Sequence, residues 1–116
     1  MKCLFLSVIL AASVGCGSRV TIDEHPCLPG GTTLTYDNFG KGFLDRWCQG
    51  CHAAKAPERN GAPSAYAFGS RDEASVHRDR IFAKAAAVNT SMPPGPAGPS
   101  PEERQMLADW LACGAP

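Results

Sequence analysis

The stretch Trp47-Cys48-Gln49-Gly50-Cys51-His52 decides how the rest of the chain folds. Two thiols three positions apart, followed directly by an imidazole, form the pattern required for attachment of a c-type haem. Cys48 and Cys51 lie one short turn apart, so both sulfurs can reach the vinyl groups on the haem edge and form thioethers. The motif places His52 beneath the iron as the proximal ligand, with its other ring nitrogen donating to a backbone carbonyl.

Two other uses of the Cys pair stay open: a thiol redox pair, as in thioredoxin-like proteins, and half of a structural zinc site. A thioredoxin-like motif sits in a βαβ pattern, and no strand rich in Val and Ile precedes Cys48. A zinc site requires further ligands, and the sequence offers only the scattered His25 and His77. One covalently bound, iron-containing haem c is therefore the cofactor that the sequence favours.

The N-terminal residues 1–15 are typical of an export signal. Lys2 supplies a minimal charged region, and Cys3 to Val14 form an apolar run that is short for a bilayer-spanning helix. We therefore expect the protein to be exported to the periplasm and the signal to be removed.

The end of the apolar run, Val14-Gly15-Cys16, resembles the lipobox of bacterial lipoproteins, in which cleavage before the cysteine leaves that cysteine acylated. Ser13 departs from the pattern, because Leu is usual at that position. The sequence predicts lipidation of Cys16, which would attach the protein to a membrane, and a tether over residues 16–35. Ordinary signal-peptidase cleavage and an uncleaved anchor are the alternatives.

Length and charge restrict the remaining part of the chain. A mature chain of about 100 residues forms one domain with a modest core, which we place at residues 36–116. The 11 basic and 11 acidic residues are interspersed and give a formal charge of zero, so no basic field indicates nucleic-acid binding.

The six cysteines must each have a role in an oxidising compartment. Four of them are assigned: Cys3 leaves with the signal, Cys16 carries lipid, and Cys48 and Cys51 hold the haem. Cys27 and Cys113 remain and are predicted to form one disulfide; the alternative is that one or both are free thiols.

The segment from Tyr36 to Trp47 is predicted to be a helix. Its apolar residues recur at the helical spacing of three or four positions: Phe39, Phe43, Leu44 and Trp47. Asp37 is the expected N-cap. Gly40 and Gly42 weaken a helix, so we expect one of them to permit close contact with another helix.

Two further helices follow from the same reasoning. The last helix begins at the cap Ser100 and ends at Gly114. Pro101 suits its first position, and Glu102 and Glu103 suit the positive end of the helix dipole. Its apolar stripe consists of Met106, Leu107, Trp110 and Leu111. A middle helix is predicted over Ser70 to Val88, with Ser70 as its cap and with Val76, Ile81, Phe82 and Ala85 in the core. His77 stands among charged residues and is predicted to face solvent; the alternative is that it is a ligand.

From Tyr36 to Gly114 the chain resembles a small class I c-type cytochrome. The resemblance implies an all-α fold of three to four helices packed around one covalently bound haem. In that family a glycine and an apolar residue before the haem motif cross the C-terminal helix. Gly40 and Leu44 hold these positions, and Leu107 and Trp110 resemble the facing pair.

The resemblance also implies two further haem-binding residues. In the family a Gly-Pro follows the haem motif, and its proline carbonyl accepts a hydrogen bond from the proximal histidine. Gly61-Ala62-Pro63 is similar but carries an extra Ala, and Pro63 is the expected acceptor. Met92, in a loop that its following prolines keep from being helical, stands where the family presents a distal methionine. The other interpretation of Met92 is a core methionine.

Ligation by His52 and Met92 would leave no open position on the iron, which implies electron transfer rather than enzymatic catalysis. A transient redox protein partner would contact the exposed haem edge near Gln49, Ala53 and Ala54. A haem sensor or peroxidase-like enzyme with a labile Met92, and a structural lipoprotein module with zinc, are the alternative functions. The sequence identifies neither electron donor nor acceptor.

Overall fold

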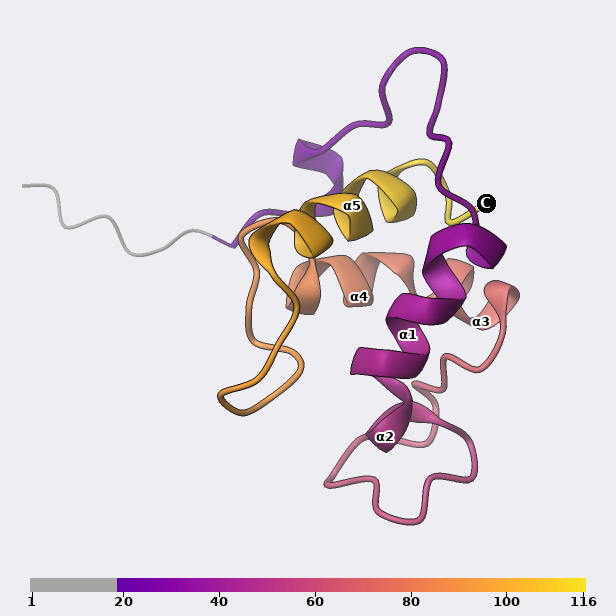
Figure 1. The fold of residues 1–116 in the computed structure, drawn as a ribbon, viewed down its shortest axis with the longest axis vertical. Helices are drawn as coiled ribbons and strands as arrows, with labels where there is room; N and C mark the ends of the chain where they lie inside the picture. The colour runs from indigo at the N-terminus through magenta and orange to yellow at the C-terminus, as the bar shows by residue number, and fades with distance from the viewer. Residues whose placement is uncertain (1–18) are drawn as a thin grey trace, which may run out of the picture.

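The computed structural model describes residues 19–116, so the predicted signal and Cys16 lie outside the described residues. Within 19–116 every regular element is helical, which confirms the expected all-α fold (Figure 1). The elements are a 3₁₀ turn η1 (Ile22–Glu24), a π-helical turn η2 (Tyr36–Gly40) and the helices α1 (Lys41–Trp47), α2 (Gln49–His52), α3 (Arg71–Val76), α4 (Arg78–Ala85) and α5 (Pro101–Ala112).

The helix that leads to the haem motif begins at Thr35 rather than at Asp37. The Thr35 backbone is extended, and its side chain accepts a hydrogen bond from the Asn38 amide at 3.1 Å. The Asn38 side chain accepts in return from the Thr35 amide at 2.7 Å. The prediction of Asp37 as the cap was therefore wrong, because this reciprocal pair satisfies the first free amides two residues earlier. From Thr35 the chain continues through η2 into α1.

Helices η2 and α1 cross α5 where Gly40 meets Trp110. A Cβ at Gly40 would lie 2.3 Å from Cζ2 of Trp110, whereas a Cβ at Gly42 would have nothing within 4 Å. Leu44, Leu107 and Trp110 are buried around this crossing. The expected close contact is thus confirmed, and Gly40 is the glycine that makes it.

Helix α5 has the predicted ends. The Ser100 side chain accepts from the Glu103 amide at 3.1 Å, and the Glu103 carboxylate accepts from the Ser100 amide at 2.8 Å. Pro101 occupies the first turn, and the helix stops before Gly114. Leu107, Trp110 and Leu111 are buried, but Met106 is 39% exposed because it lies beyond the edge of the buried face. The prediction of Met106 in the apolar stripe was therefore wrong.

The predicted middle helix is two helices, α3 and α4, separated at His77. Ser70 caps α3 as expected, with its side chain accepting from the Glu73 amide. At His77 the backbone (φ −100°, ψ 12°) departs from α-helical geometry, and α4 then ends at Ala85 rather than near Val88. Ile81, Phe82 and Ala85 are buried as predicted. Val76 is 79% exposed, so its assignment to the core was wrong.

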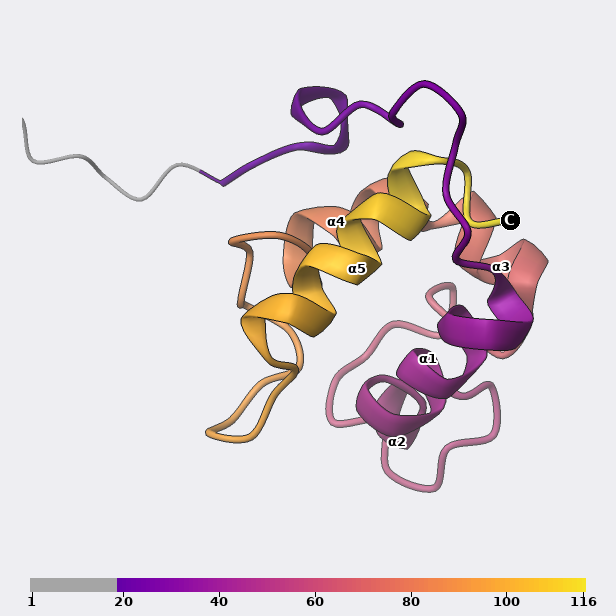
Figure 2. The ribbon, with the colours of Figure 1, turned by 45° about the horizontal axis from the view of Figure 1, so that its top comes forward.

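The described part of the predicted tether packs on the helices instead of extending away from them. Figure 2 shows this segment running past α5 toward η2. Val20, Ile22 and Leu34 contact the core, and His25 Nε2 lies 2.8 Å from an Asp109 carboxylate oxygen. A disulfide joins Cys27 to Cys113 at the end of α5. No helix in 19–116 is long and apolar enough to cross a bilayer.

Candidate haem site

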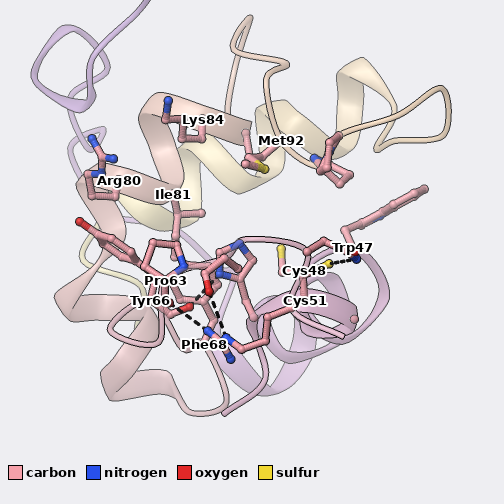
Figure 3. A pocket seen from close by; sticks show the side chains of 18 of the residues that line it. Trp47, Cys48, Cys51, Pro63, Tyr66, Phe68, Arg80, Ile81, Lys84 and Met92 are labelled. Atoms are coloured by element: carbon pink, nitrogen blue, oxygen red, sulfur yellow. Dashed lines mark hydrogen bonds between the residues drawn. The ribbon is translucent and has the colours of Figure 1, made fainter. Parts of the chain in front are cut away.

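A cavity of about 330 Å³ opens between the Cys motif, the loop that follows it, helix α4 and the Met92 loop (Figure 3). Its walls are mainly apolar or aromatic, with a smaller set of polar groups. The apolar and aromatic side chains include Phe43, Trp47, Pro63, Tyr66, Phe68, Ile81, Ala85, Met92, Pro93 and Pro94, and the other groups include Cys48, Cys51, His52, Arg59 and Asn60.

The two thiols of the motif both line this cavity and are free. Helix α2 brings them together, since the Cys51 and His52 amides both donate to the Cys48 carbonyl, at 3.2 and 2.9 Å. Burial raises the pKa of the Cys48 thiol to about 12, so this thiol is protonated at neutral pH. Asn60 Nδ2 donates to Cys51 Sγ at 3.4 Å, and this contact positions the second sulfur.

The His52 ring is fixed on both its edge and its face. Nδ1 lies 2.7 Å from the Tyr66 carbonyl oxygen, and the Phe68 ring stacks on the imidazole with centroids 4.6 Å apart. Because a carbonyl can only accept, Nδ1 carries the hydrogen, and Nε2 keeps a lone pair for a metal ion. The ring is therefore held in one orientation, in which Nε2 could bind a metal ion.

The acceptor for His52 is Tyr66, so the prediction that the Pro63 carbonyl accepts this hydrogen bond was wrong. The Pro63 carbonyl accepts instead from Arg59 Nη2 at 2.9 Å and from the Tyr66 amide at 3.0 Å. The extra Ala62 lengthens the turn, and its own carbonyl also accepts from Arg59, at 3.1 Å from Nε. Pro63 thus lines the cavity wall, while the turn that it begins presents Tyr66.

Met92 lies across the cavity from Cys48 and Cys51, on the side of α4 (Figure 3). The residue is 38% exposed. Its amide donates to the Lys84 carbonyl at 2.9 Å, and its carbonyl accepts from Arg104 Nη1 at 2.9 Å. The backbone of Met92 is therefore attached to both α4 and α5.

Four cations and no carboxylate belong to the described residues that line the cavity: Arg46, Arg59, Arg80 and Lys84. A haem carries two propionate carboxylates, for which such cations are suitable counter-charges. Two thiols, an imidazole nitrogen, a thioether and apolar walls supply the rest of what a c-type haem requires. The residues present therefore fit this group. Within 19–116, no three or more His, Cys, Asp or Glu side chains gather as a metal-binding cluster.

Besides Pro63, two residues around the cavity differ from the sequence-based expectation. His77 does not simply face solvent, because its ring packs on Tyr66 and Phe68 with centroids 5.0 and 5.9 Å away. Gln49 is half-buried and donates from Nε2 to the Phe68 carbonyl at 2.7 Å. Its side chain therefore supports the wall around His52, whereas Ala54 is exposed as expected.

Sequence reasoning missed Tyr66, Phe68 and Arg104. The role of Tyr66 depends on its backbone carbonyl, which no side-chain pattern indicates. Arg104 could have been noticed, because it stands three and seven positions before the buried Leu107 and Leu111, on the same face of α5. A cation in an apolar stripe indicates a buried polar contact.

Comparison with known proteins agrees with this geometry. The family model described as cytochrome C oxidase, cbb3-type, subunit III, matches residues 38–111. Neither the curated proteins nor the solved structures give a match. The family match includes the Cys motif, the cavity walls and Met92, and it spans more than half of the chain. The chain therefore belongs to the cytochrome c oxidase, cbb3-type, subunit III family, as a small c-type cytochrome domain of the kind that carries out haem-based electron transfer.

Proposed function

We propose that this domain is a single-haem electron carrier with His52 and Met92 as axial ligands. The observation that carries the proposal is the composition of one cavity, which is lined by two free thiols, an oriented imidazole and a thioether. Cys48 and Cys51 would attach the haem by thioethers. Bound there, the haem supplies an iron that alternates between the ferric and ferrous states.

The residues around the ligands favour electron transfer over substrate chemistry. The hydrogen bond from His52 Nδ1 to Tyr66 and the stacked Phe68 ring hold the imidazole in one orientation. The Met92 backbone is held by Lys84 and Arg104. If His52 and Met92 both bound the iron, no position would be left for a substrate, and the domain by itself would not be an enzyme. A Met/His pair of ligands raises the reduction potential.

The partner that we propose is another redox protein that docks transiently. The motif provides a small exposed area beside the thiols, since Gly50 and Ala54 are exposed and Ala53 is half-exposed. Such an area suits brief contacts, because little surface has to be desolvated before an electron passes. The family relationship supports a redox partner but identifies neither donor nor acceptor.

We further propose that the protein acts in the periplasm at a membrane surface. Residues 1–15 would direct export, and acylation of Cys16 would provide the anchor. The disulfide between Cys27 and Cys113 suits an oxidising compartment.

Intact mass measured after acid-acetone extraction tests the covalent attachment. The polypeptide should retain the added mass of one haem, and a Cys48→Ser/Cys51→Ser variant should not. A polypeptide that has the mass of the apoprotein after extraction would remove the proposal. A colourless protein containing zinc would replace it with the structural module.

A further inference from the structure

One arginine is buried in the last helix without an acidic partner. Arg104 on α5 is 7% exposed, and none of the ion pairs found within 19–116 includes it. Withdrawing a cation from water is costly unless strong hydrogen bonds replace its hydration. The acceptors of its hydrogen bonds therefore indicate what this residue does.

All the acceptors of Arg104 Nη1 are backbone carbonyls of one short segment. The nitrogen lies 2.7 Å from the Ala85 oxygen, 3.1 Å from the Asn89 oxygen and 2.9 Å from the Met92 oxygen. Ala85 is the last residue of α4, and Met92 lines the cavity. One guanidinium nitrogen thus organises the whole connection between α4 and the distal methionine.

Burial does not hold Met92 in place, since the residue is 38% exposed. Its backbone is held at both ends of the residue: the amide donates to the Lys84 carbonyl at 2.9 Å, and the carbonyl accepts from Arg104. The direction of the thioether therefore depends on backbone hydrogen bonds to two helices.

The middle acceptor, Asn89, is itself fixed by its side chain. Asn89 is 6% exposed. Its Oδ1 accepts from the Val20 amide at 3.2 Å, and its Nδ2 donates to the carbonyls of Val20 at 2.7 Å and Phe82 at 3.0 Å. Arg104 therefore fastens the Met92 loop to a rigid point of the core.

We propose that Arg104 is the positioning residue of the distal ligand: by binding the carbonyls of Ala85, Asn89 and Met92 it keeps the Met92 thioether directed into the cavity toward His52. This inference rests on the proposed function, because it requires Met92 to be an iron ligand. It adds that the ligand is held from α5, through a residue that is not among those lining the cavity.

The test compares three variants of the haem-loaded, full-length protein. Arg104→Met removes every donor at similar length. Arg104→Lys keeps the charge and a donor nitrogen but on a shorter side chain, which cannot reach all three carbonyls equally well. Arg71→Met removes an exposed arginine of α3 as the control. Three properties are measured: the rate of cyanide binding to the oxidised protein, hydrogen exchange of the Met92 amide, and the urea midpoint of the helical circular dichroism.

Arg104→Met should bind cyanide about tenfold faster or more, since the lost charged hydrogen bonds shift the loop toward its open form by about that factor. The Met92 amide should exchange faster by a similar factor, while the Cys48 amide, which donates to Leu44 at 2.8 Å, stays protected. Arg104→Lys should give an intermediate rate, and Arg71→Met should match the wild type. If Arg104→Met does not fold, Arg104→Lys carries the test by the same measurements.

Unchanged cyanide binding and Met92 exchange in both Arg104 variants, even with a lower urea midpoint, would overturn the inference and leave Arg104 a general core residue. The proposed function has a separate control. If Met92→Ala binds cyanide at the wild-type rate, Met92 is not a ligand and the function fails. If Met92→Ala accelerates binding but the Arg104 variants do not, only the inference about Arg104 fails.

Discussion

Gly40 lies directly against the indole of Trp110, so that a Cβ at Gly40 would be 2.3 Å from Cζ2 and 2.5 Å from Cη2. The indole cannot easily move aside, because it is fully buried and its Nε1 donates to the Pro116 carbonyl at 3.1 Å. The same carbonyl accepts from the Tyr36 amide at 2.6 Å. This crossing therefore determines how the helix that ends beside Cys48 sits on α5.

Gly40→Ala should lower the free energy of unfolding by about 1–3 kcal/mol, because overpacking against Trp110 outweighs the gain in helix propensity. Gly42→Ala is the matched control. A Cβ there meets nothing within 4 Å, so this change should raise the free energy of unfolding by about 0.5–1 kcal/mol. Urea denaturation followed by circular dichroism measures the free energy of unfolding of both variants. Equal changes in the two variants would contradict a close contact between Gly40 and Trp110.

Met92→Ala should open the distal side of the haem. The oxidised wild type should show the weak red charge-transfer band of iron–methionine bonding, and the variant should lose it, bind cyanide or carbon monoxide and have a lower reduction potential. The thioethers should persist, since they depend on Cys48 and Cys51.

Two controls accompany the Met92 variant. Met106→Leu is a nearly volume-conserving change at a half-exposed position and should leave the spectrum unchanged at a cost below about 1.5 kcal/mol. His77→Ala should also keep the band, because His77 packs on Tyr66 and Phe68 and does not line the cavity. A spectrum that responds to His77→Ala and not to Met92→Ala would indicate two histidine ligands and a lower potential.

The disulfide between Cys27 and Cys113 should be found by peptide mapping without reduction. The two cysteines are 86 positions apart, and a loop of that length is worth about 4–5 kcal/mol in the chain-entropy model. Replacing both with Ser should therefore lower the urea midpoint, with a loss of about 2–5 kcal/mol. Free thiols at both positions in exported protein would refute the pairing.

Cys16→Ser should release the domain from membranes into the soluble fraction. Haem attachment and the visible spectrum should not change, because the haem motif lies far from this position in the chain. Fractionation with haem staining measures the outcome. Membrane association that survives the change would favour an uncleaved N-terminal anchor over acylation.

The elements predicted best from the sequence were those with a local physical cause. Ser100 and Pro101 start α5 through capping chemistry that needs no distant partner. The pair Gly40 and Gly42 signalled a close helix contact, and the resemblance to class I cytochromes pointed to Gly40 as the glycine at the crossing. Residues that depend on distant partners were less predictable. Asp37 is a plausible cap until Thr35 and Asn38 are seen to pair, and Val76 fits the helical period only if no break occurs at His77.

The candidate site divides in the same way. Cys48, Cys51 and His52 form a contiguous motif, and all of them line one cavity with Met92. The carbonyl that accepts from His52 could not be predicted, because the backbone of every residue in the following loop offers the same group. In the structure Arg59 binds the carbonyls of Ala62 and Pro63, and the Tyr66 carbonyl accepts from the imidazole.

The attachment of the N-terminal segment has a mechanical consequence. A pull on the chain from before residue 19 would first load the hydrogen bonds between Val20 and Asn89, then the contact between His25 and Asp109. Once these contacts broke, the force would reach the disulfide between Cys27 and Cys113, which is covalent. Tension applied at the proposed membrane anchor would therefore enter the fold through the disulfide at the end of α5, before it reaches α1 and the Cys motif.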